Sequence, residues 1–458
     1  MKKWVCLLSV IAILLTLVAC GPSAQANTTT TSLVTTTTTE NATSATAQST
    51  ITNTTTMTGI TVTTKSVTTT TVGTTTTAVA TTTTTTATVT TTATTATQQT
   101  VKWFSEEPIR ITAAEVDAIL SQPYVKPKNV ILMIGDGMGQ NDITLCREYG
   151  VGKFDFGLIL DRIPNRGECT TFSLDSSVTD SAAAGTALAT GQKTYNGSIG
   201  KLGTGTNLKN ACEIARENGK RVGVVTNDAV LGATPSAFVA HAITREGDNQ
   251  IAQGFVRFLP NVVIGQGYED FMHAVPNPFK KYLDPVIVSK SITAAQSQLN
   301  TDLNCEKSFF GFFEDMTTKQ PNDRLAQSAE IALNRLKNKD GFFLMVENAT
   351  TDKAGHSNNI AEKVNSVSTL DRALAVVLKF MKENPDTLLL ITSDHETGGV
   401  QLPAEGIGLS KDLFTTVNHT GAPVAVFAVG YGASKFRNTT VDNTDIGKAV
   451  IAAVKGEW

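Results

Sequence analysis

Continuous apolar runs, separated by amphipathic stretches, fill the chain from about residue 101 to its end. Unbroken apolar runs are typical of strands that are buried on both faces of a parallel sheet, whereas half-exposed strands alternate. We therefore predict buried strands at Val130–Ile134, Val222–Thr226, Phe342–Val346, Leu388–Thr392 and Val424–Val429.

Apolar residues with helical spacing lie between these runs. They predict helices at Leu208–Asn218, Arg324–Asn338, Val367–Glu383 and Asp445–Val454. Gly219 follows the first helix and Pro385 follows the third, as expected where a helix ends. The alternation predicts an α/β fold with an open, mostly parallel central sheet and helices on both faces.

The N-terminus resembles the export signal of a bacterial lipoprotein. Lys2 and Lys3 precede an apolar run that is short for a membrane span, and the run ends in Leu-Val-Ala before Cys20. We expect residues 1–19 to be removed, Cys20 to carry a lipid, and the protein to be anchored on the outer side of the bacterial cell membrane or on the cell surface. The alternative is an ordinary signal peptide with a chance cysteine.

Residues 20–100 form a segment of low complexity that is dominated by Thr. Between residues 27 and 99 the only charges are Glu40 and Lys65, and there is no Pro or aromatic residue. Few large apolar side chains are present to offset the entropy of ordering, so we predict a disordered linker. The β propensity of Thr leaves a strand as the alternative. Residues 101–458 are then the globular domain.

The net charge and the cysteine content exclude few classes of protein. The net charge of −3 at pH 7 gives no sign of a nucleic-acid partner, and any anion site must take its positive charge from bound cations or a local Arg. The spacing of Cys146, Cys169, Cys212 and Cys305 fits no zinc ribbon, and whether they form disulfides stays open.

Acidic and imidazole side chains follow several predicted strands. Ligands bind open α/β sheets at the carboxyl ends of the strands. Mixed Asp and His sets suit zinc, and all-oxygen sets suit magnesium. One Asp-His step is weak support, but its recurrence at several strand ends indicates a metal centre. The residues concerned are Asp136, Glu347, Asp352, His356, Asp394, His395 and His419.

Ser181 lies where an Ala-rich helix is predicted to begin. Thr179 or Asp180 can cap this helix, and Gly191 follows its end. Backbone N–H groups at a helix N-terminus favour an anion and an ionised oxygen. Taken alone, the segment favours an Ala-rich core helix that has a polar cap.

Together these segments resemble the alkaline phosphatase family, from about Lys128 to Gly432. Stretches without obvious catalytic residues match as well, and several motifs in the family's order are highly specific. They are Thr179–Ala183, Lys193–Gly197, Ala233–Pro235, Val239–His241 and Gly341–Leu344.

The resemblance implies hydrolysis of small phosphate monoesters through a phosphoserine at Ser181, with two zinc ions and one magnesium ion. Arg245 matches the arginine that binds phosphate, Asp180 matches the carboxylate that orients it, and Lys353 suits a water-mediated phosphate contact. The implied ligands are Asp352, His356 and His419 for one zinc; Asp136, Asp394 and His395 for the second; and Asp136, Thr234 and Glu347 for magnesium.

Two departures from the family pattern bear on these expectations. Gly232 stands where many relatives carry Asp or His, so we expect weaker magnesium binding. The stretch between His395 and His419 is short for a protruding subdomain, which puts the family's homodimer contacts in doubt. The remaining histidines match no ligand: we interpret His241 as structural and His273 as a surface residue.

The sequence is also compatible with other functions. A phosphodiesterase or phosphomutase of the same superfamily would share the metal ligands, but a diesterase would not need Arg245. A sulfatase would need a different nucleophile segment from the one around Ser181. A surface-anchored binding protein with an inactive head is the alternative outside the enzymes.

Overall fold

The computed structural model describes residues 60–72, 75–87, 109–299, 307–314, 316 and 321–458. The chain divides into two compact units, Met1–Gln98 and Gln99–Trp458, which are described separately. The predicted signal at 1–19, the lipid site at Cys20 and the other parts of the predicted linker lie outside the described residues. Export and lipid anchoring therefore stay predictions.

In the first unit the described residues form a hairpin. Strand β1 (Ile60–Val72) pairs antiparallel with β2 (Thr75–Ala87). This is the strand alternative that β-branched Thr favours, because Thr fits an extended backbone. An isolated two-stranded hairpin is at best marginally stable in water, so the pairing is compatible with a linker that lacks a fixed structure.

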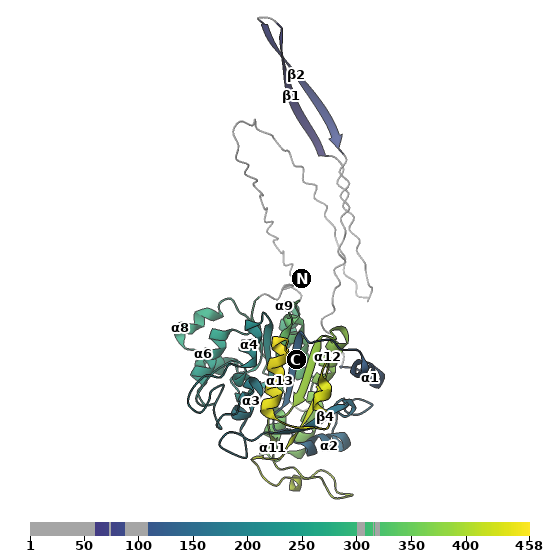
Figure 1. The fold of residues 1–458 in the computed structure, drawn as a ribbon, viewed down its shortest axis with the longest axis vertical. Coiled ribbons are helices and arrows are strands. Elements are labelled where there is room, and N and C mark those ends of the chain that lie inside the picture. The colour runs from purple at the N-terminus through teal and green to yellow at the C-terminus, as the bar shows by residue number, and fades with distance from the viewer. Residues whose placement is uncertain (1–59, 73–74, 88–108, 300–306, 315, 317–320) are drawn as a thin grey trace, which may run out of the picture. The chain divides into compact units, whose positions relative to one another are not determined.

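The second unit is built on one large sheet (Figure 1). The described strands follow the order β14-β4-β13-β10-β3-β9-β5-β6-β8-β7, and among them only β13 runs against the others. Their bounds are β3 Asn129–Gly135, β4 Asn165–Thr170, β5 Arg221–Ala229, β6 Val262–Gln266, β7 Ile287–Ser289, β8 Phe309–Phe312, β9 Phe342–Asn348, β10 Thr387–Thr392, β13 Val424–Val429 and β14 Thr440–Asp442. A short ribbon pairs β11 (Glu396–Thr397) with β12 (His419–Thr420).

Helices cover both faces of this sheet, as predicted. They are α1 Ala113–Ser121, α2 Gln140–Tyr149, α3 Ser181–Thr190, α4 Ala211–Glu217, α5 Ala233–Ala237, α6 Asp248–Phe258, α7 Tyr268–Ala274, α8 Asn277–Lys280, α9 Ile292–Leu299, α10 Arg324–Leu336, α11 Thr350–His356, α12 Ile360–Glu383 and α13 Asn443–Lys455. Short 3-10 turns lie at Leu160–Arg162, Lys281–Leu283, Lys411–Leu413 and Ala433–Phe436.

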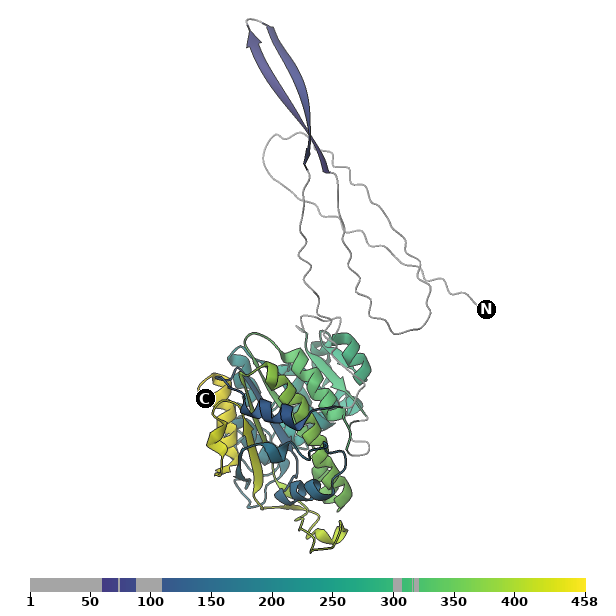
Figure 2. The same cartoon turned by 90° about the vertical axis from the view of Figure 1, so that its right-hand side faces the viewer.

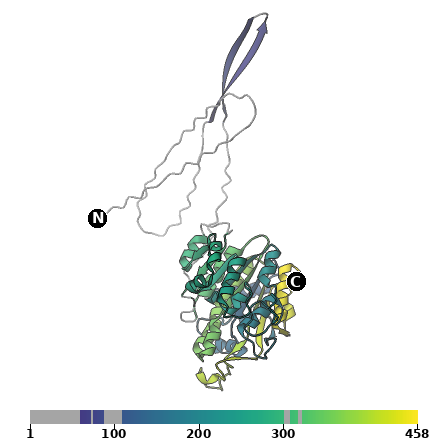
Figure 3. The ribbon, with the colours of Figure 1, turned by 90° about the vertical axis from the view of Figure 1, so that its left-hand side faces the viewer.

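Two hydrophobic cores lie on opposite sides of the sheet, because every residue of the central strands β3, β9 and β10 is buried. Alternate side chains of each strand point to opposite faces. Ile131 belongs to the core that includes residues of α1, α10 and α12, the layer that faces the viewer in Figure 2. Leu132 belongs to the core that includes residues of α3, α4, α6 and α13, and the α6 side of this layer faces the viewer in Figure 3.

Three helices begin at other residues than predicted, because a capping side chain fixes the first residue of each. Asn210 accepts a hydrogen bond from the Glu213 amide, so α4 begins at Ala211 rather than Leu208. Asn359 caps α12, which begins at Ile360 and is about two turns longer than the predicted Val367–Glu383. Asp442 caps α13, which begins at Asn443 rather than at the predicted Asp445.

In the described residues no helix combines the length and apolar character that crossing a bilayer requires. Cys146, Cys169 and Cys212 are buried free thiols, and Cys305 lies outside the described residues. Burial raises the pKa of the Cys146 and Cys169 thiols to about 12, so both are protonated and unreactive.

Candidate active site

The carboxyl ends of the central parallel strands bring the predicted ligands together. In the sheet register, Ile134 of β3 lies between Thr392 of β10 and Glu347 of β9. Asp136 follows β3 directly, and one residue separates Asp394 from the end of β10. Adjacent strand ends therefore place these carboxylates at one edge, although they are far apart in the sequence.

The first group of converging side chains comprises Asp136, Asp394 and His395, all of them buried. Nε2 of His395 lies 3.5 Å from Oδ1 of Asp136 and 3.2 Å from Oδ2 of Asp394. Neither of these carboxylate oxygens has a hydrogen-bond partner, although both are buried. Buried oxygens are rarely left without partners, so the group fits a cation.

The second group comprises Asp352 and His356 of α11 together with His419 of β12. Nε2 of His356 and Nε2 of His419 lie 3.4 and 3.5 Å from Oδ1 of Asp352. Nδ1 of His356 contacts the Val417 carbonyl, and Nδ1 of His419 contacts the Thr179 carbonyl. A carbonyl only accepts, so each neutral ring carries its proton on Nδ1 and turns the lone pair of Nε2 toward the shared point. This donor set also fits zinc.

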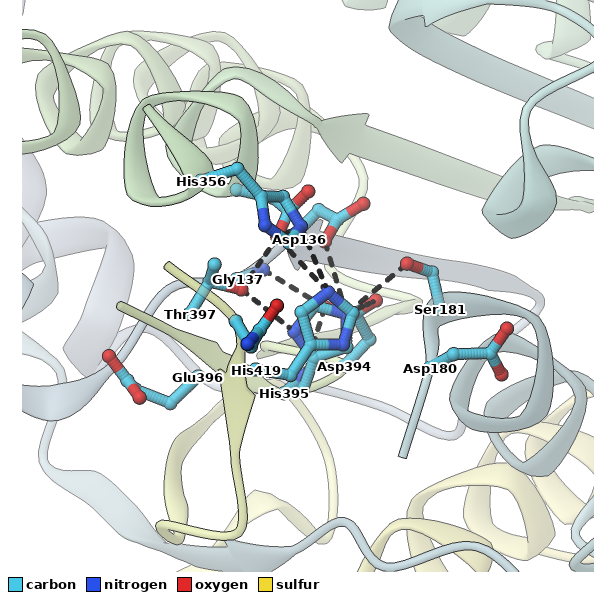
Figure 4. A network of polar contacts seen from close by, with 12 residues as sticks. Asp136, Gly137, Asp180, Ser181, His356, Asp394, His395, Glu396, Thr397 and His419 are labelled. Atoms are coloured by element: carbon cyan, nitrogen blue, oxygen red, sulfur yellow. Dashed lines mark hydrogen bonds and ion pairs between the residues drawn. The ribbon is translucent and has the colours of Figure 1, made fainter. Parts of the chain in front are cut away.

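The two groups touch each other (Figure 4). The rings of His395 and His419 stack with their centroids 3.6 Å apart. Thr397 links the groups, since its hydroxyl donates to Asp352 Oδ1 at 2.5 Å and lies 3.2 Å from His395 Nδ1. Two adjacent donor sets of this kind can hold two cations side by side.

Buried carboxylates leave an excess of negative charge here. Burial, and then the charges of Asp394 and Asp352, raise the pKa of Asp136 well above its usual value. Burial raises the pKa of Asp394 to about 6, and the charge of Asp352 adds to this effect. Burial and the nearby His419 lower the pKa of His395, which favours the neutral ring that a metal needs. Bound cations would relieve the repulsion between the carboxylates.

Ser181 is the first residue of α3, and its side chain points toward the first group (Figure 4). Its Oγ lies 3.2 Å from Nε2 of His395, and the residue is only 4% exposed. Asp180 caps the helix by accepting from the Ala183 amide at 2.9 Å. Its other oxygen accepts a hydrogen bond from Nη1 of Arg245 at 3.2 Å. The predicted nucleophile, cap and arginine thus lie together.

The residues expected to bind magnesium lie on the β5 side of Asp136. Glu347 and Thr234 are buried there, and burial raises the pKa of Glu347 to about 7. The charges of Asp228 and Asp394 act on Glu347 in the same direction. Lys353 forms an ion pair with Asp228, a residue that the sequence did not single out.

The other histidines follow their predicted roles. His241 lies outside the site, where Nδ1 contacts the Gly200 carbonyl at 2.7 Å and Nε2 contacts Glu213 at 3.1 Å. His273 is exposed, although it lies on α7 rather than in a loop.

Sequence reasoning missed Asp228, Lys363, Glu396 and Thr397, which contact segments that carry candidate ligands. Glu396 is buried and accepts hydrogen bonds from the Gly399 and Val400 amides and from the Thr420 hydroxyl, next to His419. For Glu396 and Thr397, the one available sequence signal was their position directly after Asp394-His395.

A buried carboxylate and imidazole site at the carboxyl edge of a mostly parallel sheet defines a metal-binding α/β protein. The family model for alkaline phosphatase matches residues 127–275 and 290–408. The chain belongs to the alkaline phosphatase family.

Among its relatives, alkaline phosphatase 3 of Bacillus subtilis (strain 168) is 32% identical over 304 residues, covering 61% of this chain and 63% of the relative. The alkaline phosphatase of Escherichia coli (strain K12) is 30% identical over 344 residues, covering 62% of this chain and 72% of the relative. The chain thus spans a little under two thirds of the Bacillus subtilis protein.

Solved structures agree with the fold. The alkaline phosphatase from the Antarctic bacterium TAB5 superposes with a TM-score of 0.65 at 27% identity, covering 73% of this chain and 100% of the other. A histidine-to-aspartate mutant of the TAB5 enzyme, with Mg bound in its M3 site, gives a TM-score of 0.62 at 26% identity, covering 73% of this chain and 99% of the other.

Proposed function

We propose that this protein hydrolyses phosphate monoesters through a phosphoserine at Ser181, using two zinc ions and one magnesium ion. The observation that carries the proposal is the convergence of carboxylate and imidazole ligand atoms on two adjacent points. Two of the carboxylate oxygens are buried without a hydrogen-bond partner, and the Ser181 hydroxyl lies beside the first point. Membership of the alkaline phosphatase family supports the same activity.

The donor sets suggest which residues hold each ion. Asp136, Asp394 and His395 would hold one zinc, and Asp352, His356 and His419 the other. Asp136, Thr234 and Glu347 offer oxygen atoms alone, which suits magnesium. When bound, these cations lower the pKa of the attacking oxygen and neutralise the charge that develops on the leaving oxygen.

Ser181 supplies the nucleophile. Its Oγ forms a bond to phosphorus as the bond from phosphorus to the ester oxygen breaks, and the alcohol leaves with a proton. A water molecule then attacks the phosphoserine, which releases inorganic phosphate and restores the hydroxyl. The N-terminus of α3 favours the negative charge of both the attacking oxygen and the phosphoryl group.

Arg245 positions the phosphoryl group and favours monoesters. One guanidinium N–H donates to Asp180, which orients the planar side chain. The guanidinium fork matches two phosphoryl oxygens, and a monoester offers more unesterified oxygens than a diester. A phosphodiesterase would gain less from this residue.

The activity is tested by turnover of 4-nitrophenyl phosphate and of bis(4-nitrophenyl) phosphate, with zinc content measured on the same samples. We expect the native chain to prefer the monoester strongly, and Ser181→Ala to lose turnover while it keeps its zinc. Full activity in Ser181→Ala would exclude the phosphoserine route. A preference for the diester would favour the phosphodiesterase alternative.

We further propose that the protein is exported and anchored through a lipid on Cys20. The basic residues, the apolar run and the Leu-Val-Ala-Cys sequence support this. Incorporation of labelled palmitate into the native protein but not into Cys20→Ser is the expected result. Equal labelling of the two would end the proposal.

A further inference from the structure

Lys363 is a completely buried lysine near the start of α12, with a side chain that is 0% exposed. Its Nζ forms an ion pair with Oδ2 of Asp142 at 3.0 Å. It also donates to the Gly137 carbonyl at 2.8 Å and lies 3.4 Å from the Thr351 carbonyl. An ammonium group has three N–H donors, so these three partners account for all of them.

Both carbonyl partners belong to segments that carry candidate metal ligands. Gly137 directly follows Asp136 of the first group, and its amide donates to Oδ1 of Asp394 at 3.1 Å. Thr351 directly precedes Asp352 of the second group. Through two backbone atoms, one buried ammonium group therefore connects a ligand of each metal position.

The two segments are also in close contact at this point. Gly137 has a φ of +68°, and a Cβ added there would lie 2.7 Å from Cα of Asp352. Only glycine can adopt this backbone so close to the neighbouring chain. Small shifts of the Gly137 loop would therefore change the spacing between the two ligand groups, and Lys363 restrains that loop through the Gly137 carbonyl.

Asp142 completes the arrangement from α2. Its side chain is 0% exposed, and its Oδ2 also accepts a hydrogen bond from the Gly139 amide at 2.7 Å. A buried ion pair often contributes little to stability, because removing both charges from water costs about as much as their attraction returns. Stability alone is therefore a weak reason for this pair, whereas its contacts with the ligand segments give it a specific role.

We infer that Lys363 is a positioning residue, paired with Asp142, that fixes the spacing between the two zinc sites by holding the Gly137 and Thr351 carbonyls. This inference rests on the proposed function. Groups just outside a metal's ligands typically change its affinity by about 10- to 100-fold when they are removed. Lys363 acts through the backbone of two ligand segments at once, so its loss weakens both sites rather than one.

The test is the rate at which zinc leaves the holoprotein for an excess of a chromogenic chelator, measured without any substrate. The main variant is Lys363→Met combined with Asp142→Leu, which removes both charges and leaves neither buried alone. Its matched control is Arg372→Met with Asp323→Leu, which removes another ion pair of α12 that lies away from the ligand segments. Circular dichroism and thermal unfolding of each variant establish that it folds.

We expect release of both zinc ions to be at least about tenfold faster in the main variant and within about twofold of native in the control. If the main variant does not fold, Lys363→Gln with Asp142→Asn, which keeps polar groups of similar size, replaces it and is expected to release zinc faster than native. Native-like release from a folded variant would overturn the positioning role while leaving the proposed function intact. A native chain that binds no zinc would overturn both.

Discussion

Nε2 of His356 lies 3.2 Å from Nε2 of His419, although each ring already uses Nδ1 to contact a backbone carbonyl. In neutral rings the two facing nitrogens both present lone pairs, which repel each other unless a cation lies between them. Asp352 points an oxygen at the same place. This relationship between two histidines is the clearest sign of a metal position in the molecule.

Replacing one of these histidines should remove one of the two proposed zinc sites and leave the other. We expect His419→Ala to bind one zinc fewer per chain than the native protein, while Asp136, Asp394 and His395 keep theirs. Elemental analysis after dialysis measures the difference. His273→Ala, which changes an exposed histidine on α7, should bind as much zinc as the native chain. Equal zinc content in His419→Ala would contradict the assignment.

Arg245 determines the preference for monoesters in this account. Loss of a hydrogen bond to a charged group costs about 1.5–3 kcal/mol, so Arg245→Ala should lower kcat/KM for 4-nitrophenyl phosphate by about 10- to 100-fold. The effect on the bis ester should be much smaller. Arg257→Ala is a suitable control, because Arg257 lies on α6 over the ring of Phe279. Equal losses on both esters would show that Arg245 does not distinguish them.

By its resemblance to the family, Gly232 stands near the proposed magnesium position, where many relatives carry Asp or His. We expect Gly232→Asp to reach half-maximal activity at a lower magnesium concentration, because a further oxygen ligand or water-binding group strengthens an outer shell. An added Cβ would lie 2.9 Å from the Ala229 carbonyl, so a small backbone shift must accompany the change. Gly232→Ala separates the two effects, and identical magnesium titrations for the native and Asp variants would refute the expectation.

His241 should make stability depend on pH, away from the metal ligands. Burial lowers its pKa, but the hydrogen bonds with Glu213 and Gly200 outweigh burial, so the pKa lies above the usual 6.5. A raised histidine pKa stabilises the fold below about pH 6.5 and loses this contribution as pH rises through the folded value. The pKa of Glu213 is lowered despite its burial, so its contribution is lost as pH falls below about 4.5.

The corresponding measurement compares the Tm of native and His241→Gln proteins between about pH 6 and pH 9 in the presence of zinc. The native advantage should be largest at the acidic end of this range and should shrink as pH rises. His273→Gln is the control for zinc that is lost in acid, because His273 is exposed and lies outside the site. A native advantage that grows with pH would contradict the assigned ion pair.

The sequence predicted the central strands because their apolar runs are unbroken, and Val424–Val429 was predicted with the bounds that the structure shows. It could not predict that this strand runs against its neighbours, since a uniformly apolar run carries no information on direction. Strand β4 was missed because exposed Arg166 and Glu168 alternate with buried Gly167 and Cys169, and β8 was missed because it is very short.

The candidate ligands were found because each follows a strand or matches a family motif. The residues that contact the ligand segments were not found, and the reasons are physical. A lysine in a helix is usually solvated, so nothing in the pattern around Lys363 distinguishes it from an exposed charge. Its burial depends on Asp142, which lies far away in the sequence. The ion pair of Lys353 with Asp228 likewise needs the sheet to bring β5 and α11 together.

The most direct test of the central claim is mass spectrometry of the zinc-loaded protein after incubation with a monoester and rapid quenching in acid. We expect a phosphoryl group on the peptide that contains Ser181, and we expect it to be absent after zinc removal and in Ser181→Ala. Turnover of the monoester with no phosphoserine, or with phosphate on a different residue, would contradict it.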